Sequence, residues 1–208
     1  MKKNLFKVLL LLVVVTLAGC YPDGPDYVDE YDIVYTNYDD QYNFSGKRTY
    51  AMPDSVVKLT GSVIDGGDLE FVNPAYANTI LTQIAGNMAS RGYVRINDRD
   101  SADMVLFPSA IEITNISYYY DYWGYYYGWY YPPYYGGWYY PYPIVTSYTT
   151  GTLIMSMIDN KNFNPSDKQE AVWTGLINGL LEGTSTDYNN RIKRSIDQAF
   201  TQSQYLHP

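Results

Sequence analysis

The chain has 208 residues, and its 14 basic and 22 acidic side chains give a formal net charge of −8. Nucleic acids require a basic surface, so a chain this acidic is expected to have no nucleic-acid partner. It has one cysteine, so no disulfide can form within it, and its one histidine, His207, lies beside the last residue, a poor place for a general base or a zinc ligand. We therefore expect no catalytic residues, no metal site and no cofactor.

The first 20 residues have the pattern of a bacterial lipoprotein signal. Three lysines precede an unbroken apolar run over residues 8–15, which is shorter than the roughly 20 residues that cross a bilayer. The run leads to a Leu-Ala-Gly-Cys sequence ending at Cys20, which is similar to the lipoprotein box. In that box the cysteine thiol is linked to diacylglycerol and the cysteine becomes the first residue of the mature chain. We expect residues 1–19 to be the signal peptide and Cys20 to be the lipid attachment site.

Residues 20–30 are rich in acids, proline and glycine, a composition typical of a solvated tether. Without residues 1–19 the chain keeps 11 basic and 22 acidic residues, so its body would be repelled by anionic lipid and the acyl chains would hold it at the membrane. No aspartate directly follows Cys20, which favours sorting to the outer membrane. We expect a lipid-anchored envelope protein, on the periplasmic or the surface face.

Residues 31–205 are expected to form a single domain that begins with extended segments, at residues 32–35, 44–53 and 55–59. Asn73 followed by Pro74 is typical of a helix start, and an apolar residue at every fourth position from Tyr76 predicts an amphipathic helix that ends before Gly92. The pattern then predicts a short strand, three long strands and a last helix, over residues 93–96, 103–117, 144–158, 171–181 and 186–203. This β-α-β-β-β-α order predicts an α+β fold, in which two helices cover one face of a mixed, mostly antiparallel sheet.

An aromatic insert, residues 118–143, joins two of the long strands and is expected to form a long tyrosine-rich hairpin extension or loop. Residues 118–142 contain fourteen tyrosines and three tryptophans. The insert is interpretable as low-complexity sequence without a ligand, as a binding surface of flat amphipathic rings, or as a segment that enters the lipid headgroup layer. The candidate ligand-binding residues are Tyr122, Trp123, Trp129, Tyr134, Trp138 and Tyr140.

Short motifs follow one another through the domain: Thr49-Tyr50-Ala51-Met52-Pro53, Arg91-Gly92-Tyr93, Ser101-Ala102-Asp103, Gly151-Thr152-Leu153 and Val172-Trp173-Thr174-Gly175. Their order resembles a lipoprotein family known as domain of unknown function 4136, and the likeness extends from about Tyr31 to Tyr205. Asp159 matches an aspartate that is usual in that family. The resemblance implies no activity and no catalytic residues. From the residues themselves, we expect the motif positions to serve the core and the turns.

Two functions follow as hypotheses. The first is a non-catalytic envelope lipoprotein that presents its tyrosine-rich extension to an envelope protein, a glycan or peptidoglycan. The alternative is a hydrolase that acts on envelope glycans through two carboxylates, with the aromatic rings as a platform for sugars.

Overall fold

The computed structural model describes residues 33–60, 68–111, 151–161, 171–181 and 187–208, all within one compact unit, Tyr31–Pro208. The predicted signal peptide, the tether, Cys20 and the six aromatic candidates of the insert lie outside the described residues. In the described ranges no helix combines the length and the hydropathy that crossing a membrane requires.

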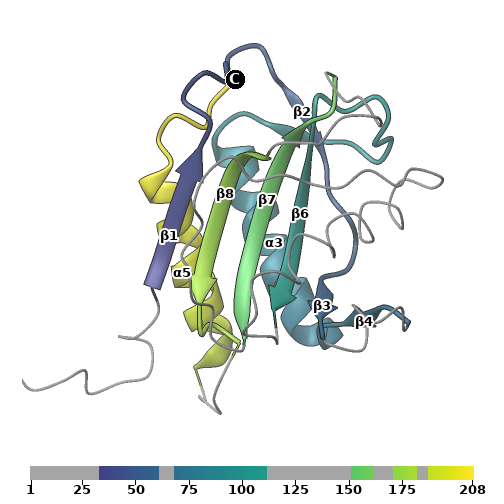
Figure 1. Ribbon diagram of the computed structural model, residues 1–208, viewed down its shortest axis with the longest axis vertical. Helices are drawn as coiled ribbons and strands as arrows, with labels where there is room; N and C mark the ends of the chain where they lie inside the picture. Colours follow the sequence, from purple (N-terminus) through teal and green to yellow (C-terminus); the bar gives the residue numbers. More distant parts are fainter. Residues whose placement is uncertain (1–32, 61–67, 112–150, 162–170, 182–186) are drawn as a thin grey trace, which may run out of the picture. The chain divides into compact units, whose positions relative to one another are not determined.

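An eight-stranded sheet forms the centre of the domain, with its main strands in the order β1-β8-β7-β6-β2-β5 (Figure 1). Strands β6, β7, β8 and β1 are antiparallel neighbours, which confirms the predicted meander of three long strands. Strands β2 and β3 run parallel to β6, so the sheet is mixed, as predicted. The strands are β1 (Ile33–Tyr38), β2 (Thr49–Ala51), β3 (Val57–Leu59), β4 (Glu70–Phe71), β5 (Val94–Arg95), β6 (Met104–Ile111), β7 (Thr152–Asp159) and β8 (Ala171–Asn178).

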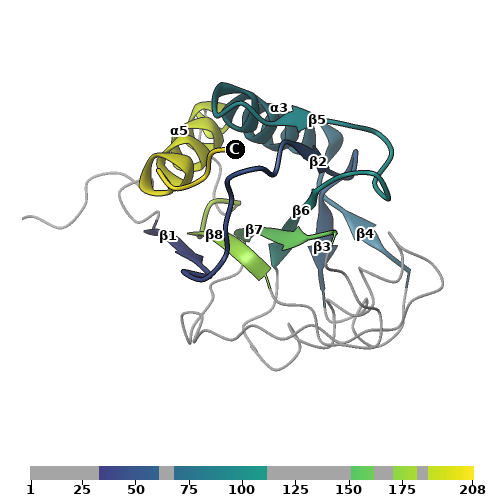
Figure 2. The ribbon, with the colours of Figure 1, turned by 90° about the horizontal axis from the view of Figure 1, so that it is seen from above.

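Two helices, α3 (Pro74–Ser90) and α5 (Tyr188–Gln202), pack side by side on one face of the sheet (Figure 2). The start of α3 is as predicted: the Asn73 side chain accepts a hydrogen bond from the Ala75 amide at 3.0 Å, and Pro74 occupies the first turn. Its end is also as predicted, because Gly92 adopts a positive φ of 92°, which favours glycine.

The core lies between the sheet and the two helices. Trp173 of β8 is fully buried there, with its ring 5.3 Å from that of Phe200 on α5. The Trp173 indole N–H donates to the Ser203 hydroxyl at 2.9 Å, so its one polar atom is paired inside the core. All eight residues of β6 are buried.

Strand β6 has two short partners along the same edge. β2 pairs with its beginning, through Met104 and Val105, and β3 pairs with its end, from Ser109 to Ile111. Between β2 and β3 the chain leaves the sheet at residues 52–56. On the side of β6 that faces β2 and β3, Pro108 therefore has no paired residue.

Candidate binding site

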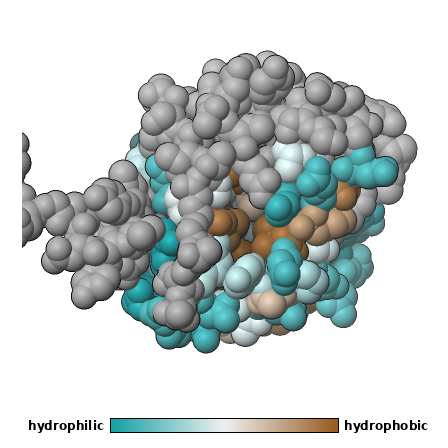
Figure 3. All heavy atoms as spheres, turned by 90° about the horizontal axis from the view of Figure 1, so that it is seen from below, coloured by the Kyte–Doolittle hydropathy of each residue, from teal (hydrophilic) through white to brown (hydrophobic). Residues whose placement is uncertain are grey.

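A hollow of about 380 Å³ lies at the end of the domain where β6 stops and both helices begin. Three aromatic side chains reach it from separate elements: Phe71 from β4, Tyr76 from α3 and Tyr188 from α5. Ala110, Gly151 and Leu181 contribute to its wall, and Lys58 is the only charged residue among the described residues that line it. Figure 3 looks onto this end, where hydrophobic residues gather on the visible face. We call it the aromatic hollow.

The local sequence explains how the rings reach this position. Tyr76 lies in the first turn of α3, immediately after the Asn73 cap, and Tyr188 is the first residue of α5. Because the two helices lie side by side, their first turns bring the two rings to 4.6 Å between centroids, with 57° between their planes. Tyr76 was expected to belong to the buried stripe of its helix, but 39% of it is exposed, as is 42% of Phe71. Large exposed rings on a concave surface are typical of a binding site.

The two described residues that flank the stretch containing the aromatic insert, Ile111 and Gly151, lie at the same end of the domain. Ile111, the last residue of β6, pairs with Thr152, the first of β7, and the Gly151 amide donates to the Ile111 carbonyl at 2.8 Å. The chain between them therefore leaves and re-enters the sheet beside Gly151, which lines the hollow.

A second hollow of about 380 Å³, here called the polar hollow, lies between the segment after β2 and the segment after β5. Arg95 donates to the Asp54 carboxylate at 2.6 Å, and Arg99 donates to Asp100 at 3.1 Å. The hydrogen bond from the Ser101 hydroxyl lowers the pKa of Asp98 below its ordinary value. The described residues include no group of three side chains that could hold a metal ion.

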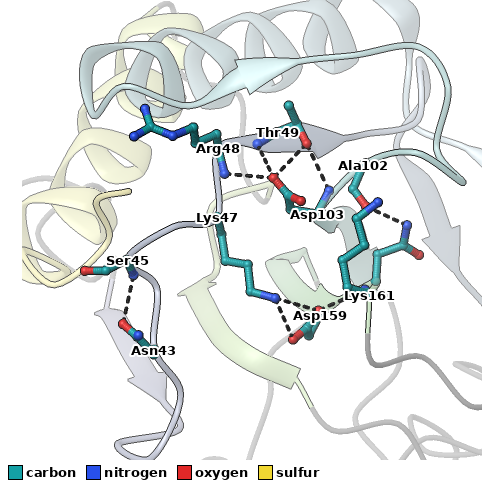
Figure 4. Close-up of polar contacts among 10 residues, drawn as sticks. Asn43, Ser45, Lys47, Arg48, Thr49, Ala102, Asp103, Asp159 and Lys161 are labelled. Atoms are coloured by element: carbon teal, nitrogen blue, oxygen red, sulfur yellow. Dashed lines mark hydrogen bonds and ion pairs between the residues drawn. The ribbon is translucent and has the colours of Figure 1, made fainter.

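Two of the family-like motifs, those that begin at Thr49 and at Ser101, meet in one network with Asp159 (Figure 4). The Asp103 carboxylate accepts hydrogen bonds from the Arg48 amide at 2.8 Å and from the amide and hydroxyl of Thr49 at 2.9 Å each. Burial alone would raise the pKa of Asp103, but these hydrogen bonds hold it below its ordinary value. Asp103 thus ties the segment before β2 to the start of β6.

Asp159 continues the network from the end of β7. Its carboxylate forms an ion pair with the Lys47 ammonium at 3.1 Å and accepts a hydrogen bond from the Lys161 amide at 2.9 Å. The Lys161 ammonium donates to the Ser101 carbonyl at 2.7 Å (Figure 4). The contact between Lys47 and Asp159 joins segments that are 112 residues apart in the chain. The structural role expected for the motif residues is consistent with this arrangement.

The sequence did not identify the aromatic hollow. Phe71 belongs to β4, a strand that was not predicted, and Tyr76 had been placed in the core. The available signal was an aromatic residue at the first turn of each predicted helix.

Comparison with known proteins gives a family and a fold. A family model described as "Domain of unknown function (DUF4136)" matches residues 34–203. The chain is similar to a DUF4136 family protein from Bacteroides thetaiotaomicron VPI-5482 with a known crystal structure, with 32% identity, a TM-score of 0.68, and coverage of 85% of this chain and 97% of that one.

A more distant structure, a PelC dodecamer from Paraburkholderia phytofirmans, aligns with 15% identity and a TM-score of 0.38 over 83% of this chain and 98% of that one. That likeness is too low to support an argument about this chain. A search of the curated proteins found no match.

Proposed function

Since this chain belongs to the DUF4136 family, a family without a described activity, we propose a function from its own residues. The protein is a non-catalytic lipoprotein of the bacterial envelope that binds a ligand at the aromatic end of its domain. The observation that carries the proposal is the aromatic hollow, where three rings from three elements lie beside Gly151, the first described residue after the stretch that contains the tyrosine-rich insert.

The chemistry of the hollow favours a ligand with a flat, weakly polar face. Phe71 and Tyr76 offer exposed rings, and Tyr188 supports Tyr76 from the side. Such rings stack on the apolar faces of sugars and on apolar side chains, and the tyrosine hydroxyls bind water or ligand. A volume of about 380 Å³ suits a ligand group of one or two sugar rings. An envelope glycan is therefore the ligand class we propose first, with an envelope protein second.

The hydrolase alternative has no support in the described residues. A glycosidase needs a carboxylic acid whose pKa is raised so that it is protonated at neutral pH. The three described carboxyl groups whose pKa is shifted, Asp98, Asp103 and Asp187, all have a lowered pKa.

Ligand binding is tested with full-length protein in detergent micelles, with chitohexaose as a soluble glycan probe and calorimetry as the readout. Phe71→Ala combined with Tyr76→Ala is expected to weaken binding at least tenfold, because each aromatic ring that stacks on the ligand contributes on the order of 1 kcal/mol. Val94→Ala is the matched control, since Val94 is also an exposed apolar side chain, 58% accessible, but lies on β5. Equal binding by all three proteins, or release of shorter sugars, contradicts the proposal.

Membrane anchoring is tested separately at Cys20. With the thiol removed by Cys20→Ser, the expected result is loss of metabolic palmitate labelling and movement of the protein from the membrane fraction to the soluble fraction. Two acyl chains anchor firmly because each buried methylene contributes about 0.8 kcal/mol. If labelling and fractionation are unchanged in the Cys20→Ser variant, the anchoring proposal is wrong.

A further inference from the structure

Among the described strands, β1 forms one edge of the sheet and has β8 as its only neighbour. Figure 1 shows it at the outer side of the meander. Its sequence, Ile-Val-Tyr-Thr-Asn-Tyr, contains neither a charged residue nor a proline. Exposed edge strands usually carry charged residues or proline, because these prevent the unpaired backbone groups from pairing with another strand. An uncharged edge of six residues therefore needs an explanation.

The hydrogen bonds show which backbone groups of β1 point outward. The Asp39 amide donates to the Val172 carbonyl of β8 at 3.0 Å, so in an antiparallel pair Asn37 and Tyr35 also face β8. Val34, Thr36 and Tyr38 then direct their N–H and C=O groups away from the sheet. The Asn37 side chain confirms this alternation, because its Oδ1 accepts the outward Tyr38 amide at 2.9 Å.

Among the described residues, the edge of β1 is thus blocked only at Tyr38. Asn37 occupies the Tyr38 amide, whereas the outward backbone groups of Val34 and Thr36 have no hydrogen-bond partner in the described part of the chain. Two residues with both groups outward offer two donors and two acceptors in a row. This is the pattern by which an extended peptide adds to a sheet edge.

The charges beside β1 indicate what kind of strand fits. Half-buried Asp39 and exposed Asp40 follow it directly, and in the sequence Asp29, Glu30 and Asp32 precede it. A second copy of this chain, paired antiparallel at the same edge, would place these acidic flanks opposite each other, and opposed like charges destabilise a strand pair. A strand with basic residues on both sides of an uncharged centre would instead be attracted, also by the net charge of −8.

We propose that β1 is a docking edge for an extended segment of a partner protein, with an uncharged β-branched centre and basic flanks, which adds to the sheet through Val34 and Thr36. This goes beyond the ligand site proposed above, because no described residue that lines the aromatic hollow belongs to β1. The two proposals can therefore fail independently.

The test uses full-length protein in detergent and a labelled nine-residue peptide of alternating valine and threonine with two lysines at each end. Fluorescence anisotropy measures affinity, and amide hydrogen exchange measures protection. We expect micromolar binding, slower exchange of the Val34 and Thr36 amides, and at least tenfold weaker binding of the same peptide with glutamates in place of lysines.

Two variants of the protein sharpen the test. Thr36→Pro removes an outward amide without removing a hydrogen bond to β8, and it is expected to abolish binding. Should that variant misfold, Asp39→Asn combined with Asp40→Asn leaves the backbone intact and should weaken binding of the basic peptide several-fold at low salt. The proposal is overturned if the lysine-flanked and the glutamate-flanked peptides bind equally, or if binding leaves the Val34 and Thr36 amides unprotected. It is also overturned if the chain alone dimerises through β1.

Discussion

Replacing Asp103 with alanine tests whether one carboxylate holds the start of β6 to the segment before β2. The carboxylate accepts three hydrogen bonds of 2.8–2.9 Å from Arg48 and Thr49. A hydrogen bond to a charged group contributes about 1.5–3 kcal/mol, and Asp103 is partly exposed, so we take the lower end of that range for each bond. Asp103→Ala is then expected to lower the free energy of unfolding by about 3–5 kcal/mol, and Asp103→Asn, which keeps one acceptor, by about 1–2 kcal/mol.

Equilibrium urea unfolding at pH 7, followed by circular dichroism, measures both losses. Asp100→Ala is the control: Asp100 is a neighbouring carboxylate that is 76% exposed in its side chain and pairs with Arg99 at the surface. Its removal is expected to change the free energy of unfolding by no more than about 0.5 kcal/mol. A loss below about 1 kcal/mol in Asp103→Ala would refute the role assigned to this carboxylate.

The pH dependence gives a second readout of the same contact. The folded-state pKa of Asp103 lies below its ordinary value, so its contribution is fully present above the unfolded-state pKa of about 3.9 and disappears as the pH falls through the folded-state pKa. The difference in stability between the native chain and Asp103→Asn should therefore stay constant from pH 7 to pH 5 and narrow below pH 4. A difference that does not depend on pH contradicts the argument.

Two further substitutions test the packing of the core, each by urea unfolding. At Gly175 an added Cβ would lie 2.8 Å from the Met155 methyl carbon and 2.9 Å from the Trp173 ring, so Gly175→Ala should destabilise the fold by about 1–3 kcal/mol. Gly86→Ala is its control, since nothing lies within 4 Å of a Cβ there and alanine favours helix by about 0.5–1 kcal/mol, so a loss in both variants would contradict the contact argument. Trp173→Phe removes the hydrogen bond to Ser203 and leaves a cavity, for an expected loss of about 2–4 kcal/mol, and an unchanged midpoint would count against this packing.

Local signals in the sequence predicted the elements that local interactions determine. Asn73 and Gly92 mark the ends of α3 because capping and positive φ depend on only a few neighbouring residues. The three long strands were predicted from their runs of apolar and β-branched residues, although the third, β8, ends at Asn178, before the predicted residue 181. Residues 112–117 and 144–150 of the other two lie outside the described residues.

Features that depend on distant segments were harder to predict. The two-residue strand β4 forms by pairing with β3, and too few residues are involved to produce a pattern. Tyr76 follows the helical stripe of the core, but its exposure is decided by where α3 begins over the sheet, which no local pattern contains. The contact between Lys47 and Asp159 spans 112 residues, so only the fold brings the two together.

The divided edge of β6 explains how a proline is accommodated in the middle of a buried strand. The Asp103 and Ile111 carbonyls accept hydrogen bonds from Asn160 and Gly151, which places the backbone of the odd-numbered residues toward β7. The ring nitrogen of Pro108 therefore faces the interval between β2 and β3, where an amide would find no strand to accept its proton. The segment that leaves the sheet between β2 and β3 also places Met52, Pro53 and Asp54 at the wall of the polar hollow. The position that accepts Pro108 without an amide donor and the polar hollow therefore have a common origin.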